Sequence, residues 1–458
     1  MMELLTPLLR PSAVNHCFSD AAVLQGMLDF EAALAQAQAE AGVIPCSAAE
    51  TIARCCQSEL LDAGALAAAA AQAGNLAIPL VRQLTARVAE QDAQAARFVH
   101  WGATSQDAID TGLVLQLRGA LAQTDRQLTQ LMTVLVQQID RHGATLMVGR
   151  TWMQQALPTT LGLKLAGTLD ALLRYRQRLQ QMLPRVLVLQ FGGAAGTLNS
   201  LGAKGKAVSA LLAQRLQLTE ADTPWHSQRD RLLEVAGWYA GLAGTLGKLA
   251  RDISLLCQTE IAEVAEPQAE GRGGSSTMPH KRNPVSCAVI LAAAMRAPAL
   301  VSGLYQAMLQ EHERGLGGWH AEWESLPELM MLSAGALAAS VPLIDGLQVF
   351  PARMADNLAL TGGLILAEAV TMALGEQMGR QNAHRHIEQA CQHAQAANLP
   401  LLAVLEQDEQ VLKWLDRQQL AELLDPANAL GSASVFIQQV LARAKAAHQS
   451  LFTTEEQS

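Results

Sequence analysis

The sequence is poor in aromatic and charged residues for its length. Phe, Trp and Tyr make up 4% of the 458 residues and charged residues 16%, whereas hydrophobic residues make up 50%. The low aromatic content argues against an all-β sandwich, and the apolar half of the chain excludes intrinsic disorder. We therefore expect packed helices, and the length indicates more than one domain.

Basic residues and paired cysteines are also scarce. Lys and Arg number 33 against 42 Asp and Glu, which gives a formal charge of -9 and argues against nucleic-acid binding through a broad basic surface. The seven cysteines are an odd number without metal-ligand spacing, and adjacent residues such as Cys55 and Cys56 rarely form a disulfide with good geometry. We expect a reduced, cytoplasmic compartment. Residues 1–12 lack a basic segment followed by an apolar run, so no secretory signal is predicted.

The apolar stretches are too short to predict a membrane span. The most apolar ones, 63–81, 235–246 and 287–300, are each interrupted or ended by Gln, Lys, Arg, Pro or Asn before about 20 residues are reached. We expect them to be buried helices of a soluble protein without a membrane partner.

Long helical periodicity dominates the middle of the chain. Leucines recur on one helix face from Leu117 to Ile139, and Gly143 supplies a stop. A second long helix is predicted from Arg229 to Ile261, with glycines that would let a neighbouring helix approach closely. Helices of about 30 residues are about 45 Å long, and several of them side by side form a bundle. The one strand candidate is 186–191.

Three blocks follow from the positions of Pro and Gly. Residues 1–112 are expected to form an N-terminal domain of shorter helices, 113–350 a central bundle of long helices, and 351–458 a C-terminal domain of shorter helices. The expected breaks lie at Pro45, Gly64, Pro79, Gly362, Gly363, Pro400 and Pro426.

One polar segment between two long helices cannot itself be helical. Residues 270–284 read EGRGGSSTMPHKRNP, with glycines, hydroxyls and three cations. Pro284 is suited to the first turn of the next helix, whose N-terminus would add free N–H groups. The composition predicts a loop that holds an anion, with hydroxyls available for proton transfer. An exposed connector between helices is the alternative that composition leaves open.

Two further polar segments precede predicted helices. In the first, 100–107, Thr104, Ser105 and Asp107 are good N-cap residues, so capping alone would explain them. The second, 149–158, would by itself be a loop with an amphipathic Trp.

Together these segments resemble the motifs of the fumarase/aspartase superfamily. Residues 274–284 are similar to its signature loop, 104–111 to its first motif region and 151–160 to its second, in the matching order. The resemblance covers essentially the whole chain. It implies an all-α, L-aspartase-like fold of three helical domains with a central long-helix bundle. It also implies a homotetramer with active sites shared between subunits, and neither metal nor organic cofactor.

Trp152 departs from the superfamily pattern, which usually has His after the Thr of the second region. With residues 100–107, 190–194 and 320–324, this departure resembles a cycloisomerase branch of the superfamily. The branch implies that one carboxylate of a small tricarboxylate adds to a conjugated double bond and closes a lactone. In reverse, the leaving group is a carboxylate with a pKa of about 4, which needs no general acid. Trp152 could then form an apolar wall of the site, and a mere packing role is the alternative.

The resemblance also implies roles for the signature loop. Ser275 is expected to transfer the proton at the carbon next to a carboxylate, with Ser276 and Lys281 as alternatives. Lys281 and Asn283 are expected to bind the carboxylate that becomes the doubly charged aci-anion. His280 is either a substrate ligand or a structural hydrogen-bond donor.

Thr104 and Ser105 are expected to bind a second carboxylate at a helix start. Thr151 and Gln154 are expected to contact substrate from another subunit. Arg314 could bind the third carboxylate as a fork, or it could form a surface ion pair. For His100, as for His280, a substrate ligand and a structural donor remain open.

Two other functions fit parts of the sequence. An adenylosuccinate-lyase-like C–N lyase that releases fumarate can carry the same Met-Pro-His-Lys run, although Trp152 removes the histidine that would assist the amine. A non-catalytic helical scaffold is the second, and Ser275, Lys281 and Asn283 together argue against it.

Overall fold

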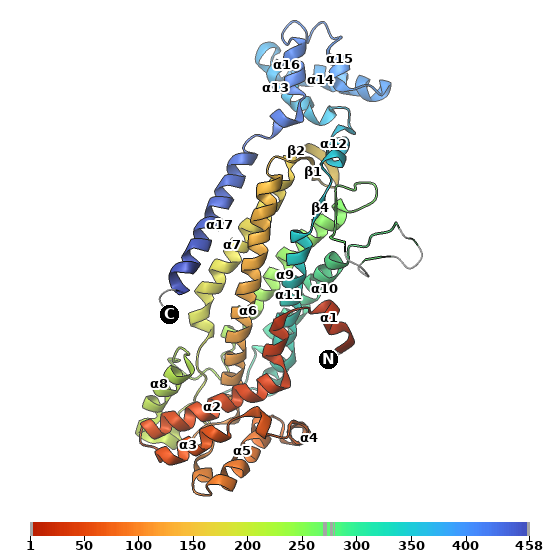
Figure 1. The fold of residues 1–458 in the computed structure, drawn as a ribbon. Helices are drawn as coiled ribbons and strands as arrows, with labels where there is room; N and C mark the ends of the chain where they lie inside the picture. Colours follow the sequence, from red (N-terminus) through yellow and green to blue (C-terminus); the bar gives the residue numbers. More distant parts are fainter. Residues whose placement is uncertain (1–2, 269–272, 275–277, 279, 456–458) are drawn as a thin grey trace. The chain divides into compact units, whose positions relative to one another are not determined.

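The structure is a computed structural model that describes residues 3–268, 273–274, 278 and 280–455. The described residues are mostly helical, as composition and periodicity predict (Figure 1). The helices are α1 Thr6–Leu9, α2 Asp20–Glu40, α3 Cys46–Cys55, α4 Ala63–Ala73, α5 Ala77–Gln91, α6 Ser105–His142, α7 Leu161–Val186, α8 Gly205–Leu216, α9 Asp230–Leu256, α10 Val285–Ala307, α11 Gly318–Asp345, α12 Pro351–Ala359, α13 Ala367–Met378, α14 Arg380–Ala397, α15 Leu401–Leu405, α16 Arg417–Leu423 and α17 Ala433–Glu455. The strands are β1 Leu146–Thr151, β2 Gln154–Thr160, β3 Val264–Ala265 and β4 Gln348–Val349.

The chain divides into two compact units, and five helices run through both of them. Unit 1 holds residues 1–128, 175–247 and 289–339, and unit 2 holds 129–174, 248–288 and 340–458. The helices shared between the units are α6, α7, α9, α10 and α11.

Unit 1 contains the short helices of the N-terminal part beside segments of the long ones. Helix α2 starts after Ser19, whose hydroxyl accepts the N–H of Ala22. It crosses α6 at a point where Gly26 faces Gly112, and a Cβ added to Gly26 would lie 2.8 Å from the Gly112 carbonyl oxygen. Two glycines therefore let these backbones meet. Figure 1 shows α2, α3 and α5 at one end of this unit.

The predicted long helix from Arg229 is shorter than expected. Helix α9 ends at Leu256 instead of Ile261, and in the turn that follows Ala262 adopts a left-handed conformation with φ 52°. The amide of Glu263 then bonds back to the Leu256 carbonyl. Of its glycines, Gly241 faces Tyr175 and Gly247 faces Ala294 closely, whereas added Cβ atoms at the other two would meet open space. The close-approach prediction thus holds at two of the four positions.

The second motif region is a β-hairpin, which the sequence did not predict. Strands β1 and β2 pair antiparallel, with Thr151 opposite Gln154. The two turn residues, Trp152 and Met153, have φ values of 52° and 64°, as a tight hairpin turn requires. The strand predicted at 186–191 is wrong: Val186 is the last residue of α7, and Val188 makes only an isolated bridge to Thr219.

Two predicted breaks also need correction. Gly64 lies inside α4, and Pro79 is the third residue of α5, where the missing N–H costs no helical bond. Helix α10 continues through Arg296 and Pro298 for 23 residues. By length and composition α10 and α11 could each cross a membrane, contrary to the sequence expectation. The apolar window of α11 is 67% buried within the chain, and that of α10 only 33%.

Candidate active site

In unit 1, the start of α6 presents two hydroxyl groups above a buried carboxylate. Asp107 is fully buried, and its oxygens accept the N–H groups of Gly192 at 3.0 Å, Gly193 at 2.9 Å and Thr104 at 3.0 Å. His226 Nε2 lies 2.7 Å from the same carboxylate. Asp107 therefore holds residues 192–193 against the start of α6.

Thr104 and Ser105 are half-buried at this helix start. Within the described part of the chain their hydroxyls have no hydrogen-bond partner, so the capping explanation accounts for Asp107 but not for them. Both hydroxyls are therefore free for hydrogen bonds at the positive end of α6.

Behind the helix start lies a buried charge network. Arg229, 3% exposed, donates to Asp110 at 2.6 and 3.1 Å and to Glu322 at 2.6 to 3.1 Å, and it stacks on Trp225 at 5.0 Å. Trp319 Nε1 also donates to Asp110. Burial alone would lower the pKa of Arg229, but the two carboxylates outweigh it and raise that pKa. Burial raises the pKa of Glu322, and Arg229 offsets this only in part.

The motif regions 104–111 and 320–324 contain Asp110 and Glu322 of this network, but nothing in them predicted the pairing with Arg229. Asp110 lies on α6, Arg229 directly precedes α9 and Glu322 lies on α11, so each pairing joins residues more than 90 apart in sequence. The available signal was the occurrence of charged residues within otherwise apolar helices, since buried charges need partners.

His100 lies in unit 1, next to a buried carboxylate. It adopts a left-handed backbone with φ 56°, and its Nδ1 lies 2.6 Å from Glu31, which is 1% exposed. Burial alone would lower the pKa of His100, but the Glu31 carboxylate outweighs it and raises that pKa. Since Glu31 occupies Nδ1, this contact supports the structural-donor interpretation.

The raised pKa of His100 predicts a pH-dependent stability. A protonated His100 stabilises the folded state fully below its unfolded pKa of about 6.5, and this contribution is lost as pH rises through the folded pKa. We expect His100→Gln to lower the free energy of unfolding more at pH 5.5 than at pH 9, measured by urea unfolding at fixed protein concentration. His16→Gln, which replaces an exposed histidine, is the control. An equal loss at both pH values would contradict an ionised pair.

Arg314 also lies in unit 1, in the segment between α10 and α11. Its Nε donates to the Gln106 side chain at 3.1 Å and a terminal nitrogen to the Ala194 carbonyl at 3.2 Å. Among the described residues no carboxylate lies within 4.0 Å of it, so it forms no surface ion pair there.

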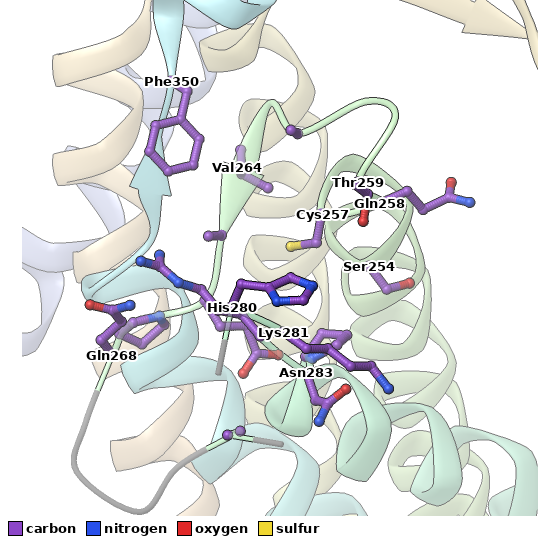
Figure 2. A pocket seen from close by; sticks show the side chains of 18 of the residues that line it. Ser254, Cys257, Gln258, Thr259, Val264, Gln268, His280, Lys281, Asn283 and Phe350 are labelled. Atoms are coloured by element: carbon purple, nitrogen blue, oxygen red, sulfur yellow. The ribbon is translucent and has the colours of Figure 1, made fainter. Parts of the chain in front are cut away.

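In unit 2, the described part of the signature loop borders a cavity of about 1290 Å³. Figure 2 shows His280, Lys281 and Asn283 gathered on the segment before α10 and facing the end of α9. His280 and Lys281 are exposed and Asn283 is half-buried. The backbone N–H of Asn283 donates to the backbone carbonyl of Gly273 at 2.9 Å, and this bond closes the base of the loop. Ser275 and Ser276 lie outside the described residues.

The N–H groups at the start of α10 are already occupied, which corrects one expectation. Glu266 accepts the N–H of Ser286 at 3.0 Å and that of Cys287 at 2.8 Å. A carboxylate of the protein itself thus fills the anion position at this helix end. The groups of this segment that could still bind an anion are therefore side chains, and Lys281 and Asn283 are the candidates.

Two neighbouring groups are unsuited to a catalytic role. Burial, with Glu266, raises the pKa of Cys257 at the cavity to about 11, so its thiol stays protonated at neutral pH and is a poor nucleophile. Arg150 is paired with buried Glu263 at 2.6 Å. Glu263 also accepts from Asn357 at 2.9 Å, which ties β1 to α12.

The hairpin in unit 2 presents three predicted site residues to solvent. Thr151, Trp152 and Gln154 are exposed, and Trp152 is 98% exposed at the tip of the turn. A fully exposed Trp in a left-handed backbone position is costly for an isolated chain. Among the described residues, no group of three or more His, Cys, Asp or Glu could hold a metal.

A family model described as Lyase matches residues 11–299. The chain belongs to this lyase family, the fumarase/aspartase superfamily. A second model, the adenylosuccinate lyase C-terminus, matches residues 363–440.

Several similar members of this family are cycloisomerases. The 3-carboxy-cis,cis-muconate cycloisomerase of Pseudomonas aeruginosa is 56% identical over 425 residues, 93% of each chain. The crystal structure of 3-carboxy-cis,cis-muconate lactonizing enzyme from Pseudomonas putida matches with a TM-score of 0.93 and 52% identity, covering 97% of this chain and 99% of that one. The nitrosuccinate lyase of Streptomyces davaonensis is 40% identical and covers 94% of this chain and 92% of its own.

Proposed function

We propose that this chain is a soluble lyase-family enzyme that interconverts 3-carboxy-cis,cis-muconate and 4-carboxymuconolactone in the catabolism of aromatic acids. Relatives with this activity are 48 to 56% identical to it over most of its length. The more distant lyase relative acts on another substrate at 40% identity. The observation that carries the proposal is therefore the high identity to enzymes of this one activity.

The reaction fits the polar groups of the chain. One carboxylate oxygen of the substrate forms a C–O bond to an alkene carbon, and the displaced electron pair collects on another carboxylate as an aci-anion. Lys281 and Asn283 stabilise that charge, since donors aimed at developing charge contribute most. Protonation of the adjacent carbon, by Ser275 in our proposal, completes the lactone. Thr104 and Ser105 hold a second carboxylate and Arg314 the third.

The assay that tests this function follows loss of the conjugated diene absorbance in the ultraviolet. We expect turnover of 3-carboxy-cis,cis-muconate and much slower turnover of cis,cis-muconate, which lacks the third carboxylate. Adenylosuccinate should release no fumarate. Fumarate release without diene loss would replace the proposal by a C–N lyase, and an inert protein would support a scaffold.

We also propose a cytoplasmic homotetramer with shared active sites and no cofactor, built from the domains 1–112, 113–350 and 351–458. Support comes from the apolar surface of α10, where Met295 is 66% and Tyr305 58% exposed. In a soluble enzyme such a face needs a partner, and a second copy of the bundle would supply one. The exposed hairpin tip would then enter a neighbouring subunit and bring Thr151, Trp152 and Gln154 to its substrate.

Trp152→His tests whether the missing histidine alone decides the reaction. Because Trp152 is 98% exposed, we expect the variant to fold normally. It should not release fumarate from adenylosuccinate, since a general acid cannot supply the pocket for a nucleotide. Met153→His, a change at the adjacent turn residue with 72% exposure, is the matched control. Fumarate release by Trp152→His and not by Met153→His would mean that this position is decisive.

A further inference from the structure

Gln106, fully buried in the first turn of α6, has an amide whose orientation is fixed by its neighbours. Its Nε2 donates to Asp110 at 3.0 Å and to the His226 carbonyl at 2.8 Å. A rotated amide would place oxygen against these two acceptors, which is unfavourable. Asp110 is itself held by Arg229, so the amide rests on a rigid support.

The carbonyl end of the same amide points to Arg314. Gln106 Oε1 accepts the Nε–H of Arg314 at 3.1 Å, and the Ala194 carbonyl accepts from a terminal nitrogen at 3.2 Å. Both acceptors are neutral, so the guanidinium is oriented while its charge stays uncompensated among the described residues. Three of its five N–H donors remain, enough for a two-point bond to a carboxylate.

We infer that Gln106 is a positioning residue that orients Arg314 for the third carboxylate of the substrate. A carboxylate at position 106 would orient the same guanidinium but also neutralise it, and it would repel Asp110. An amide is the side chain of this length that satisfies Asp110 and still offers Arg314 a neutral acceptor. The inference rests on the proposed function, since it concerns how a tricarboxylate is distinguished from a dicarboxylate.

The test compares kcat and KM for 3-carboxy-cis,cis-muconate and cis,cis-muconate in the wild type, Gln106→Met, Arg314→Met and the double variant. We expect Gln106→Met to lower kcat/KM for the tricarboxylate about 10- to 100-fold, mostly through KM, the size of a lost charge-assisted hydrogen bond. The dicarboxylate should change much less. In the Arg314→Met background the second change should add little, because the group that Gln106 orients is gone.

Gln116→Met is the matched control. Gln116 is also a buried glutamine of α6, and its Nε2 donates to the Cys17 carbonyl at 2.9 Å, away from Arg314. It should leave the preference for the tricarboxylate unchanged. Equal losses for both substrates, or additive losses with Arg314→Met, would overturn the inference and make Gln106 merely structural.

If Gln106→Met does not fold, Gln106→Glu carries the test. It should raise KM for the tricarboxylate selectively, because the new carboxylate neutralises Arg314, and an unchanged KM would overturn the inference. The wild-type assay distinguishes a failure of the proposed function from a failure of the role of Gln106. An inactive wild type overturns the proposed function, whereas an active wild type with unaffected variants overturns only the role of Gln106.

Discussion

Ser275→Ala is expected to lower kcat by about 10²- to 10⁴-fold, the usual contribution of a positioned acid or base. The proton at the carbon next to the aci-carboxylate has to come from an acid that is reprotonated before the next turnover. Ser275 stands in a segment with three cations, 270–284, which would favour its alkoxide. Stopped-flow measurement of diene loss, with the oligomer checked by light scattering, gives the result.

Ser276→Ala is the matched control for that experiment, because it removes the neighbouring hydroxyl of the same loop. It should retain most of the activity. If instead Ser275→Ala is near normal, the proton-transfer role moves to Ser276 or Lys281. Lys281→Gln then decides between them, since loss of a base lowers the high-pH plateau of kcat and loss of a carboxylate ligand raises KM.

The largest effect on stability is expected from Arg229→Met. The variant leaves Asp110 and Glu322 buried without their counterion, and removal of one partner of a buried pair typically costs about 3–5 kcal/mol. Because this network joins α6, α9 and α11, the midpoint of urea unfolding should fall sharply at fixed protein concentration.

Two comparisons separate charge from packing. Arg185→Met removes an exposed arginine paired with Glu234, and it should leave the midpoint unchanged. Adding Asp110→Asn to Arg229→Met should recover part of the loss, because one uncompensated charge disappears. A double variant as unstable as Arg229→Met would mean that lost packing on Trp225 accounts for the effect.

The long helices could be predicted because their information is local. The leucines from 117 to 139 repeat with the helical period, and α6 runs from Ser105 to His142 as that repeat and Gly143 require. The start of α10 after Pro284 follows from the same local chemistry. The end of α9 at Leu256 could not be predicted, because residues 248–266 contain no Gly or Pro to mark it.

The hairpin could not be predicted because its turn lacks the usual residues. Two-residue turns of this kind favour Asn and Gly, whereas here Trp152 and Met153 occupy both left-handed positions. Residue preferences for this turn and the observed backbone disagree at a predicted site residue, which is where such conflicts are expected. The 98% exposure of Trp152 is consistent with this, since no packing within the chain explains the Trp.

The polar network of unit 1 shows a different limit. Asp110 and Glu322 were visible within motifs, but the contact of Asp110 with Arg229 joins residues 119 apart in sequence. No periodicity encodes such a pairing, and the same holds for Gln106 and Arg314, which lie 208 apart. The motifs indicated which residues matter, and only the fold indicated which side chains act through others.

Glu266 has a consequence for how the signature loop can evolve. Its carboxylate binds the amides of Ser286 and Cys287, so the chain enters and leaves the loop at a single clamped point on α10. The start of α10 is thereby held by a residue that precedes the loop. A loop taken from a relative with another leaving group could be exchanged between Glu266 and Ser286, and these two residues would define the ends of the exchanged segment.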